Sequence, residues 1–544
     1  MASTPRTLAG SAAVSDGPSL FDTTLRDGAQ QEGLRFSVED KLKLARLLDG
    51  LGLGYIEGGW PGANPNDTAF FQRARTELDL GHSQLVAFGS TRRAGARVEE
   101  DSLVAALHDS GAPVICVVGK ADSRHVEKAL RTTLDENLAM VRDTVSHLVG
   151  LGHQVMVDCE HYFDGYRYDP EYSLSVVRAA AEAGASIAVL CDTNGGMVPS
   201  MISRIVADTA EIGLPLGIHC HNDTGCAVAN SLAAMEAGAV QIQGTMNGYG
   251  ERTGNADLVT LIGNLETKYD LRVLPEGQLA NLSGVAHAIG EIANQLPQAR
   301  QPYAGRSSFA HKAGLHASAI RIDPDLYQHI DPAVVGNDMR MLVSGMSGRA
   351  NILLKASELG FGALTRDQAG ELVELVKARE VDGYSYEAAD GSFELLLREH
   401  LGLATTAFEV LFWQASSHQT GQGEVMTTAV VSIHPTGQGS GATTVEATGN
   451  GPVHALDQAL RGALIDYFPK IAACHLTDYR VRILDDGHGT DATVRVLIDT
   501  EIDQRITATV GVGTDIIEAS WEALSDAYRH ALVCGGATAP LSLR

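Results

Sequence analysis

The side chains best suited to chemistry in this sequence lie in two short segments far apart along the chain. In the first, Leu20–Gly33 (LFDTTLRDGAQQEG), an apolar stretch gives way to a polar loop that holds Arg26 and Asp27 side by side. An acid beside an arginine, just past a strand end, suits a metal ligand next to a cation that binds an oxyanion. A surface ion pair at a turn is the alternative for these two residues taken alone.

The second segment contains two histidines separated by one residue, His219 and His221. On a strand, residues i and i+2 point to the same side, so both imidazoles can face one point while Cys220 faces away. Two convergent histidines and a carboxylate suit a divalent metal ion, to which Asn255 can add an amide oxygen. Two core histidines satisfied by hydrogen bonds are the alternative explanation of the pattern.

Eight short apolar runs are spaced along residues 19 to 275, and amphipathic helical patterns fill the gaps between them. The runs are Ser19–Phe21, Tyr55–Glu57, Leu85–Phe88, Val114–Val118, Val155–Val157, Ile187–Leu190, Leu216–Ile218 and Val240–Ile242. Apolar strands that alternate with helices predict a parallel sheet covered on its outer side, and eight such units predict a (β/α)8 TIM barrel of α/β class over residues 19–285. A doubly wound sheet is the alternative, but it does not explain eight evenly spaced units.

In such a barrel the functional residues lie where strands end and loops begin. Arg26 and Asp27 follow the first predicted strand, and His219 and His221 follow the seventh. Further polar residues at predicted strand ends include Arg92, Glu160, Thr193 and Asn255. Their crowding at one rim predicts a single active site there, in which Arg92 is a candidate for substrate binding.

The strand–helix alternation ends near residue 285. Residues 286–385 predict a helical accessory region, and residues 393–544 predict a separate C-terminal α+β domain. Within that domain, Val445–Leu460 and Thr509–Leu524 are self-similar, and each runs from a strand through a glycine turn into a helix. We therefore expect a duplicated strand–strand–helix unit with a role in ligand sensing or assembly. Residues 1–18 predict a short disordered tail without a secretion signal.

The composition limits the partners of the chain. Over 544 residues the formal net charge is −26, which argues against nucleic-acid or membrane-surface partners. Seven cysteines without a CxxC pair indicate reduced thiols and a cytoplasmic protein. No apolar run approaches the length of a transmembrane helix.

Three motifs together resemble one enzyme family. They are DTTLRDGAQ, the HCHND segment that holds both histidines, and GERTGNAD, which ends with Asn255 and the two residues after it. With HKAGLHASAI (His311–Ile320) and the duplicated C-terminal domain, they resemble the Claisen-condensing barrel enzymes: isopropylmalate, homocitrate and citramalate synthases, with hydroxymethylglutaryl-CoA lyase as a relative.

The resemblance implies roles for particular residues. The metal ligands are Asp27, His219, His221 and Asn255, and the ion is Mn, Zn or Mg. Arg26 is the catalytic arginine, which also binds substrate, and Glu160 and Thr193 are polar residues on the substrate side. His316 and Tyr327 come from the accessory region, often across a dimer, and His316 or a relay with Glu160 is the candidate base. His311 lies in the same motif and ranks below His316 as a candidate site residue.

The resemblance also implies the reaction. A 2-oxo acid accepts the acetyl group of acetyl-CoA, and thioester hydrolysis then makes the condensation irreversible. The segments EGGWPGANPND and DCEHYFDGY and the residue Ala29 are most similar to the citramalate group, which favours pyruvate as acceptor and (R)-citramalate as product. The alternatives are isopropylmalate synthesis from 2-oxoisovalerate, the reverse lyase reaction, and a non-catalytic amino-acid sensor.

The C-terminal domain resembles the regulatory domain of the same family. This implies a homodimer and an end-product amino acid as effector, isoleucine first for a citramalate route and leucine second. The turns at Gly449–Val453 and Gly513–Ile517 are expected near the effector or the dimer axis. Tight turns that bind nothing are the equal alternative, because glycine turns need no ligand to explain them.

Overall fold

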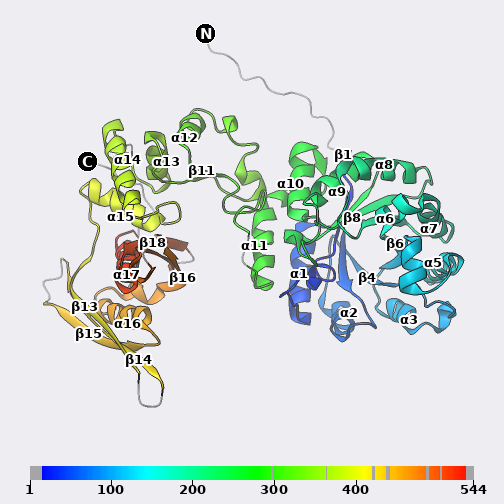
Figure 1. Cartoon of the computed structure of the whole chain (residues 1–544), viewed down its shortest axis with the longest axis horizontal. Coiled ribbons are helices and arrows are strands. Elements are labelled where there is room, and N and C mark those ends of the chain that lie inside the picture. Colours follow the sequence, from blue (N-terminus) through cyan, green and yellow to red (C-terminus); the bar gives the residue numbers. More distant parts are fainter. Residues whose placement is uncertain are drawn as a thin grey trace, which may run out of the picture. The chain divides into compact units, whose positions relative to one another are not determined.

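The computed structural model describes residues 15–295, 298–362, 364–419, 423–436, 441–484, 489–502 and 505–534. By compactness the chain divides into two units, each described here by itself (Figure 1). The first unit runs to Phe309 and takes in Ile330–Asp338, and the second holds Ala310–His329 and the chain from Met339 onward. The predicted division into a barrel, an accessory region and a C-terminal domain stays a prediction, because the two compact units have other boundaries.

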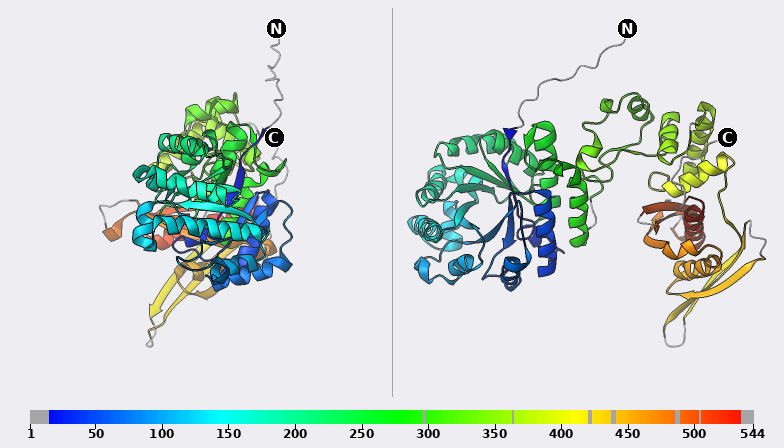
Figure 2. Two further views of the ribbon diagram at one scale, coloured as in Figure 1. Left: turned by 90° about the vertical axis from the view of Figure 1, so that its right-hand side faces the viewer. Right: turned by 180° about the vertical axis from the view of Figure 1, so that it is seen from behind.

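The first unit is built on a closed barrel of eight parallel strands in sequential order, which confirms the predicted fold. Figure 2 shows these strands surrounded by helices. The strands are β2 (Ser19–Asp22), β3 (Tyr55–Gly59), β4 (Gln84–Ser90), β5 (Val114–Lys120), β6 (Gln154–Glu160), β7 (Ile187–Asp192), β8 (Leu216–Cys220) and β9 (Gln241–Gly244). Each predicted apolar run overlaps one of them.

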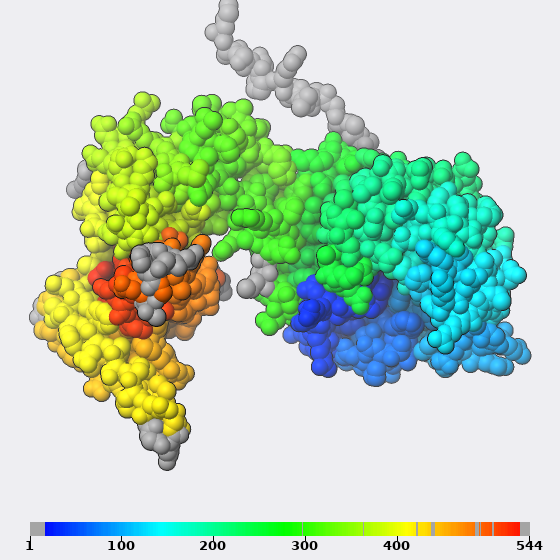
Figure 3. All heavy atoms as spheres, viewed as in Figure 1, coloured from blue at the N-terminus to red at the C-terminus, as the bar shows by residue number. Residues whose placement is uncertain are grey.

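Helices cover the outside of the barrel, so that the strands are buried on both faces. Figure 3 shows the outer surface of the chain, coloured along the sequence. They are α1 (Val38–Leu51), α2 (Pro65–Glu77), α3 (Ser102–Asp109), α4 (Ser123–His125), α5 (Leu134–Gly150), α6 (Tyr162–Tyr168), α7 (Pro170–Glu182), α8 (Pro199–Ala210), α9 (Ala227–Glu236), α10 (Leu258–Lys268) and α11 (Leu282–Ile292). Their starts carry residues that cap helices well: Ser37 forms a capping box with Asp40 at α1, and Thr133 accepts from Glu136 N at α5.

The chain joins the fold earlier than the sequence predicted. Ser15–Asp16 form the short strand β1, which pairs in parallel with β10 (Leu271–Arg272), so the expected tail of residues 1–18 is wrong at its end. Backbone hydrogen bonding decides this, since Gly17 N also donates to the Arg272 carbonyl oxygen over 2.9 Å. Residues 1–14 lie outside the described residues.

The second unit begins with a helical part, in agreement with the expected accessory region. Its elements are β11 (Ala310–His311), α12 (Gly314–Ile320), β12 (Arg340–Met341), α13 (Arg349–Glu358), α14 (Arg366–Val381) and α15 (Asp390–His400). Side chains of α13, α14 and α15 share one apolar core. In the described part of the chain, no helix combines the length and the apolar character that crossing a membrane requires.

Two similar α+β halves follow, which confirms the duplication. The first pairs β13 (Phe408–Gln419), β14 (Val425–Pro435) and β15 (Thr443–Gly449) with α16 (Pro452–Leu464). The second pairs β16 (His475–Ile483), β17 (Val494–Ile502) and β18 (Arg505–Gly513) with α17 (Ile516–Cys534) (Figure 1). Each half has three antiparallel strands, not the two expected. The self-similar segments contain only the last strand and the helix of each half, so they do not reveal how many strands come before.

The repeated small residues explain why the two halves are alike. Ala455 and Ala459 on α16 correspond to Ala519 and Ala523 on α17, and all four are fully buried in one core. A helix carrying alanines on its buried face can lie close to a sheet.

Candidate active site

Arg26 and Asp27 are held at the end of β2 by a hydrogen-bonded turn. Thr24 donates from its backbone N and its hydroxyl to the Asp22 carboxylate, over 3.0 and 2.7 Å. The Thr24 hydroxyl in turn accepts from Met246 N over 2.9 Å, which joins the turn to the chain after β9. Asp27 is therefore fixed at the barrel rim with only 4% of its surface exposed.

His219 and His221 lie at and just past the end of β8 and converge on Asp27. From Asp27 Oδ2, His219 Nε2 is 3.3 Å away and His221 Nε2 is 3.9 Å away. Cys220 points outward into the core between strands and helices, as the alternation along a strand predicts. The structure thus brings together three of the four predicted metal ligands, whose ligand atoms all lie within 4.8 Å of one another.

Asn255 reaches the same cluster through a β-bridge with His221. Its amide NH2 donates to the Tyr249 carbonyl over 3.0 Å, which leaves its Oδ1 buried without a hydrogen-bond partner. Gly250 makes this approach possible at a φ of +153°, because a Cβ there would lie 2.2 Å from Asn255 Nδ2. A buried, unpaired amide oxygen beside a carboxylate and two imidazoles fits a divalent cation.

The electrostatics favour the metal-binding forms of Asp27 and His221; burial lowers the pKa of His219, but its contact with the Asp27 carboxylate outweighs burial and raises that pKa above its usual value. Burial alone would raise the pKa of Asp27, but Arg26 and His219 hold it below its usual range. Burial and the neighbouring His219 lower the pKa of His221 to about 4, so this imidazole is neutral. Metal ligation needs an ionised carboxylate and neutral imidazoles.

Glu57 is a site residue that sequence reasoning missed. It ends the apolar part of β3, is fully buried, and accepts from Arg26 Nε over 2.6 Å. The Arg26 guanidinium also lies 3.8 Å from the centre of the Phe88 ring and 3.6 Å from Asp27 Oδ2. Glu57 therefore sets the direction in which Arg26 points, and the signal available was an acid at the end of a predicted barrel strand.

Glu160 and Thr193 lie at neighbouring strand ends on the same rim. Glu160 ends β6 and forms an ion pair with Lys120, the last residue of β5. Thr193 follows β7, and its hydroxyl accepts from His161 N over 2.8 Å. Both positions agree with the predicted side of the barrel, and their roles towards substrate stay predictions.

Arg92, a predicted substrate-binding residue, pairs with a helix outside the barrel. Its guanidinium turns towards α5, where it contacts Asp143 and Glu136 over 2.7 Å each. The side chain is 6% exposed and its backbone N donates to Thr144, so Arg92 ties β4 to this helix. These contacts give Arg92 a role in anchoring the helix, and its predicted role in substrate binding stays a prediction.

His316 and Tyr327 belong to the second unit. Their rings stack with centroids 4.1 Å apart, and the His311 ring lies 6.4 Å from that of His316. The structure thus brings the two predicted residues together with each other. Their expected contribution to the metal-centred site stays a prediction.

Comparisons with known proteins agree with the fold. Residues 17–289 match the HMGL-like family, residues 304–382 the homocitrate synthase post-HMGL domain-like family, and residues 387–532 the LeuA allosteric (dimerisation) domain.

Whole-length relatives are found as well. An (R)-citramalate synthase from Streptomyces coelicolor is 58% identical over 95% of this chain and 97% of its own. One from Synechocystis sp. is 46% identical over 95% and 97% of the two chains. A probable 2-isopropylmalate synthase from Methanopyrus kandleri is 31% identical over 93% and 96%. With the barrel, the metal-ligand cluster and the duplicated domain, these similarities show that the chain belongs to the family of HMGL-like proteins that includes the (R)-citramalate synthases.

Proposed function

We propose that this protein condenses acetyl-CoA with pyruvate in a metal-dependent Claisen reaction and hydrolyses the thioester, giving (R)-citramalate and CoA for isoleucine biosynthesis. The observation that carries the proposal is similarity over nearly the whole chain, 58% and 46%, to two (R)-citramalate synthases. The buried cluster of Asp27, His219 and His221 beside Arg26 supplies the residues that this chemistry needs.

The residues of the chain have distinct tasks in this reaction. Asp27, His219, His221 and Asn255 would hold a divalent ion of the Mn, Zn or Mg type, which would supply Lewis acidity towards the 2-oxo acid. Arg26 stabilises the negative charge that develops on the keto oxygen, in the direction set by its bond to Glu57. A base removes a proton from the acetyl methyl group, and Glu160 beside Lys120 or His316 of the accessory region is proposed for this step.

Isopropylmalate synthesis from 2-oxoisovalerate is the second candidate, and the 31% identical Methanopyrus protein is the observation in its favour. The much higher identity to citramalate synthases ranks it below pyruvate condensation. A non-catalytic sensor is disfavoured, because a barrel without activity has no reason to keep unpaired ligand atoms such as Asn255 Oδ1 buried.

Thiol release from acetyl-CoA tests the proposal. The purified protein with Mn²⁺ is assayed against pyruvate, 2-oxobutyrate, 2-oxoisovalerate and 2-oxoglutarate. Pyruvate is expected to give the highest kcat/KM, and His221→Ala is expected to abolish turnover. Preference for 2-oxoisovalerate moves the protein to the second candidate, and release with none of the acids overturns both.

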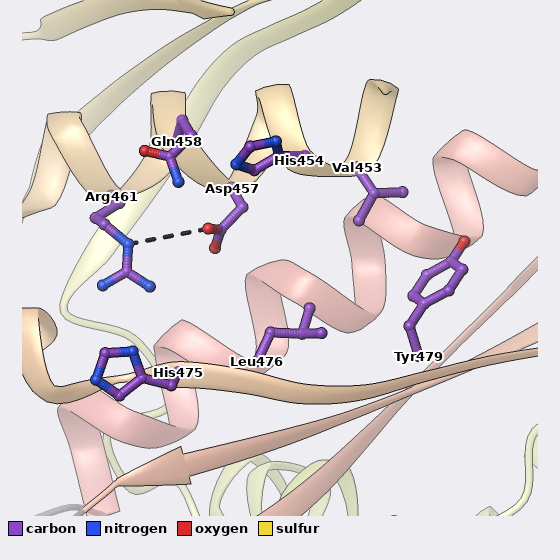
Figure 4. A pocket seen from close by; sticks show the side chains of 8 residues that line it. All are labelled: Val453, His454, Asp457, Gln458, Arg461, His475, Leu476 and Tyr479. Carbon is purple, nitrogen blue, oxygen red and sulfur yellow. Dashed lines mark ion pairs between the residues drawn. The ribbon is translucent and has the colours of Figure 1, made fainter. Parts of the chain in front are cut away.

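We also propose a pocket of the second unit as the effector site. A cavity of 640 Å³ lies between α16 and β16, lined by Val453, His454, Asp457, Gln458, Arg461, His475, Leu476 and Tyr479 (Figure 4). Val453, Leu476 and Tyr479 give it an apolar wall. Asp457 and Arg461 form an ion pair 3.9 Å apart on its polar side. Tyr528 also donates to Asp457, and Arg461 also donates to two backbone carbonyl oxygens, so both charges are held in place beside the cavity, where we propose that they meet the amine and carboxylate of an amino acid.

Isoleucine, with leucine second, is the effector that this pocket and the proposed pathway favour. Isothermal titration of the full chain is expected to detect isoleucine binding that Leu476→Trp removes by filling the cavity, with basal thiol release retained. Binding that survives this substitution unchanged places the effector elsewhere.

A homodimer is part of the proposal. The match of residues 387–532 to a dimerisation domain supports it, as do exposed apolar side chains on β13 such as Leu411 and Phe412. Light scattering after size exclusion is expected to give twice the chain mass of 57.5 kDa. A monomer at assay concentration contradicts this part alone.

A cytoplasmic location is likewise proposed. The free cysteines Cys116, Cys159, Cys191 and Cys220 are buried, as reduced packing residues are. Fractionation of expressing cells is the measurement, and recovery outside the cytoplasmic fraction contradicts it.

A further inference from the structure

Gln243, on β9, lies fully buried inside the barrel, with its side-chain amide between His219 and Asp158. Its Oε1 is 3.0 Å from His219 Nδ1, and its Nε2 donates to Asp158 Oδ1 over 3.1 Å. We propose that Gln243, oriented by Asp158, is a positioning residue that holds His219 with its Nε2 lone pair directed at Asp27 and the metal. The inference rests on the metal site of the proposed function.

The chemistry of the three groups fixes the direction of each bond. A carboxylate only accepts hydrogen bonds, so Asp158 can face only the NH2 end of the Gln243 amide. The amide oxygen must then face His219, and Nδ1 of that ring must carry the proton. An imidazole that binds a metal is neutral, so with its one proton on Nδ1 the ring would offer the ion its Nε2, which lies 3.3 Å from Asp27 Oδ2.

Asp158 has the surroundings of a pure acceptor. Its Oδ1 receives two donors, the Gln243 amide and the Cys116 thiol, the latter over 3.1 Å. Burial raises the pKa of Cys116, so this sulfur keeps its proton and donates. Asp158 is 4% exposed, and solvent therefore has little room to replace either donor.

Outer partners of metal-bound histidines fix the tautomer and ring direction, and their loss typically weakens metal affinity about 10- to 100-fold. Gln243→Leu keeps the approximate side-chain volume and removes both hydrogen bonds. We expect a rise of about that size in the Mn²⁺ dissociation constant. The measurement is titration of the full, metal-free chain with Mn²⁺ alone, with free Mn²⁺ read from its electron paramagnetic resonance signal.

Gln241 provides a matched control on the same strand. It is also fully buried and, two residues earlier, lies on the same face of β9, but its Nε2 contacts Met156 Sδ at 3.6 Å. Gln241→Leu makes the same chemical change one layer away from His219. We expect it to leave Mn²⁺ affinity unchanged. Circular dichroism and melting of the metal-free variants check that both fold.

Exchanging the amide and the carboxylate between positions 243 and 158 gives a sharper test. Gln243→Glu alone sets two carboxylates about one hydrogen bond apart and is expected to weaken Mn²⁺ binding. Combined with Asp158→Asn, the new carboxylate still accepts from His219 Nδ1 and now receives a donor from the new amide. The double variant is therefore expected to recover most of the affinity that Gln243→Glu loses.

The outcomes separate this inference from the proposed function. Equal loss in Gln241→Leu and Gln243→Leu, or affinity unchanged in folded Gln243→Leu, overturns the positioning role. So does a double variant no better than Gln243→Glu. The unaltered protein can bind Mn²⁺ and still release no thiol with any 2-oxo acid; the proposed reaction then fails while the positioning role stands.

Discussion

Neutralising Asp67 in the first unit is expected to destabilise the barrel strongly. Asp67 on α2 forms an ion pair with Lys41 on α1 over 2.6 Å, and their side chains are 8% and 4% exposed. Lys41 also donates to the Gly58 carbonyl, and Asp67 accepts from Trp60 N over 2.8 Å. The pair thus anchors the end of β3, the strand that carries Glu57.

The magnitude follows from burial. Removing one partner of a buried ion pair costs about 3–5 kcal/mol, because the other charge is left without compensation. Asp67→Asn keeps the volume but leaves Lys41 with carbonyl oxygens and no carboxylate partner, so a loss in this range is expected at pH 7. Lys41→Met combined with Asp67→Asn removes both charges and is expected to recover most of the lost free energy.

The cost also depends on pH in a definite direction. Burial lowers the pKa of Lys41, and the Asp67 carboxylate opposes that effect. Without Asp67 the pKa of Lys41 falls further, so the unfolded chain binds the lysine proton more tightly than the folded one. Stability of Asp67→Asn therefore rises with pH until it passes the unfolded lysine pKa of about 10.4.

Urea unfolding followed by Trp60 fluorescence measures this, with Trp413→Phe and Trp521→Phe in every variant as the common background. Glu77→Gln is the matched control: its pair with Arg73 on α2 has the same 2.6 Å distance but side chains 37% and 41% exposed. An exposed pair of this kind is worth about 0.3–0.5 kcal/mol. If Asp67→Asn and Glu77→Gln cost the same, or the double variant is no better than the single, the reasoning from buried charge is refuted.

Three further outcomes are expected. Burial raises the pKa of Asp22 to about 7, so the folded chain holds this proton more tightly than the unfolded chain and loses stability as pH rises from about 4 to 7. Asp22→Asn lacks this loss. In EDTA, its melting temperature should therefore rise relative to that of the unaltered protein as pH increases over the same range. A difference in melting temperature that stays constant with pH contradicts the assignment. Arg92→Gln should cost about 1–3 kcal/mol in urea unfolding, and the KM for pyruvate tests its substrate role: a raised KM supports that role and an unchanged KM removes it. Mn²⁺ at a hundred times its dissociation constant should stabilise the barrel by about 2.7 kcal/mol, and melting with and without EDTA should show no such gain in Asp27→Asn.

Sequence patterns sufficed for the barrel because its strands are buried on both faces and read as continuous apolar runs. They also placed Asp27, His219 and His221 at one rim, since parallel strand ends meet there. The pairing of Arg92 could not be predicted, because its partners Glu136 and Asp143 lie 44 and 51 residues away on a helix and the sequence around Arg92 carries no signal of them. Gln243 was not predicted for a similar reason: the role of its buried amide follows only from its contact with His219.

The charges around Arg26 support a divalent ion in this site. Asp27, Glu57 and Asp158 are three carboxylates buried in the described barrel interior close to the single guanidinium of Arg26. Unpaired buried carboxylates are costly, and desolvation accordingly raises the pKa of Glu57 to about 7 and that of Asp158 above its usual value. A divalent cation at Asp27 supplies the two positive charges that balance the set. Metal binding therefore favours ionised Asp158, the form that orients Gln243 and, through it, His219.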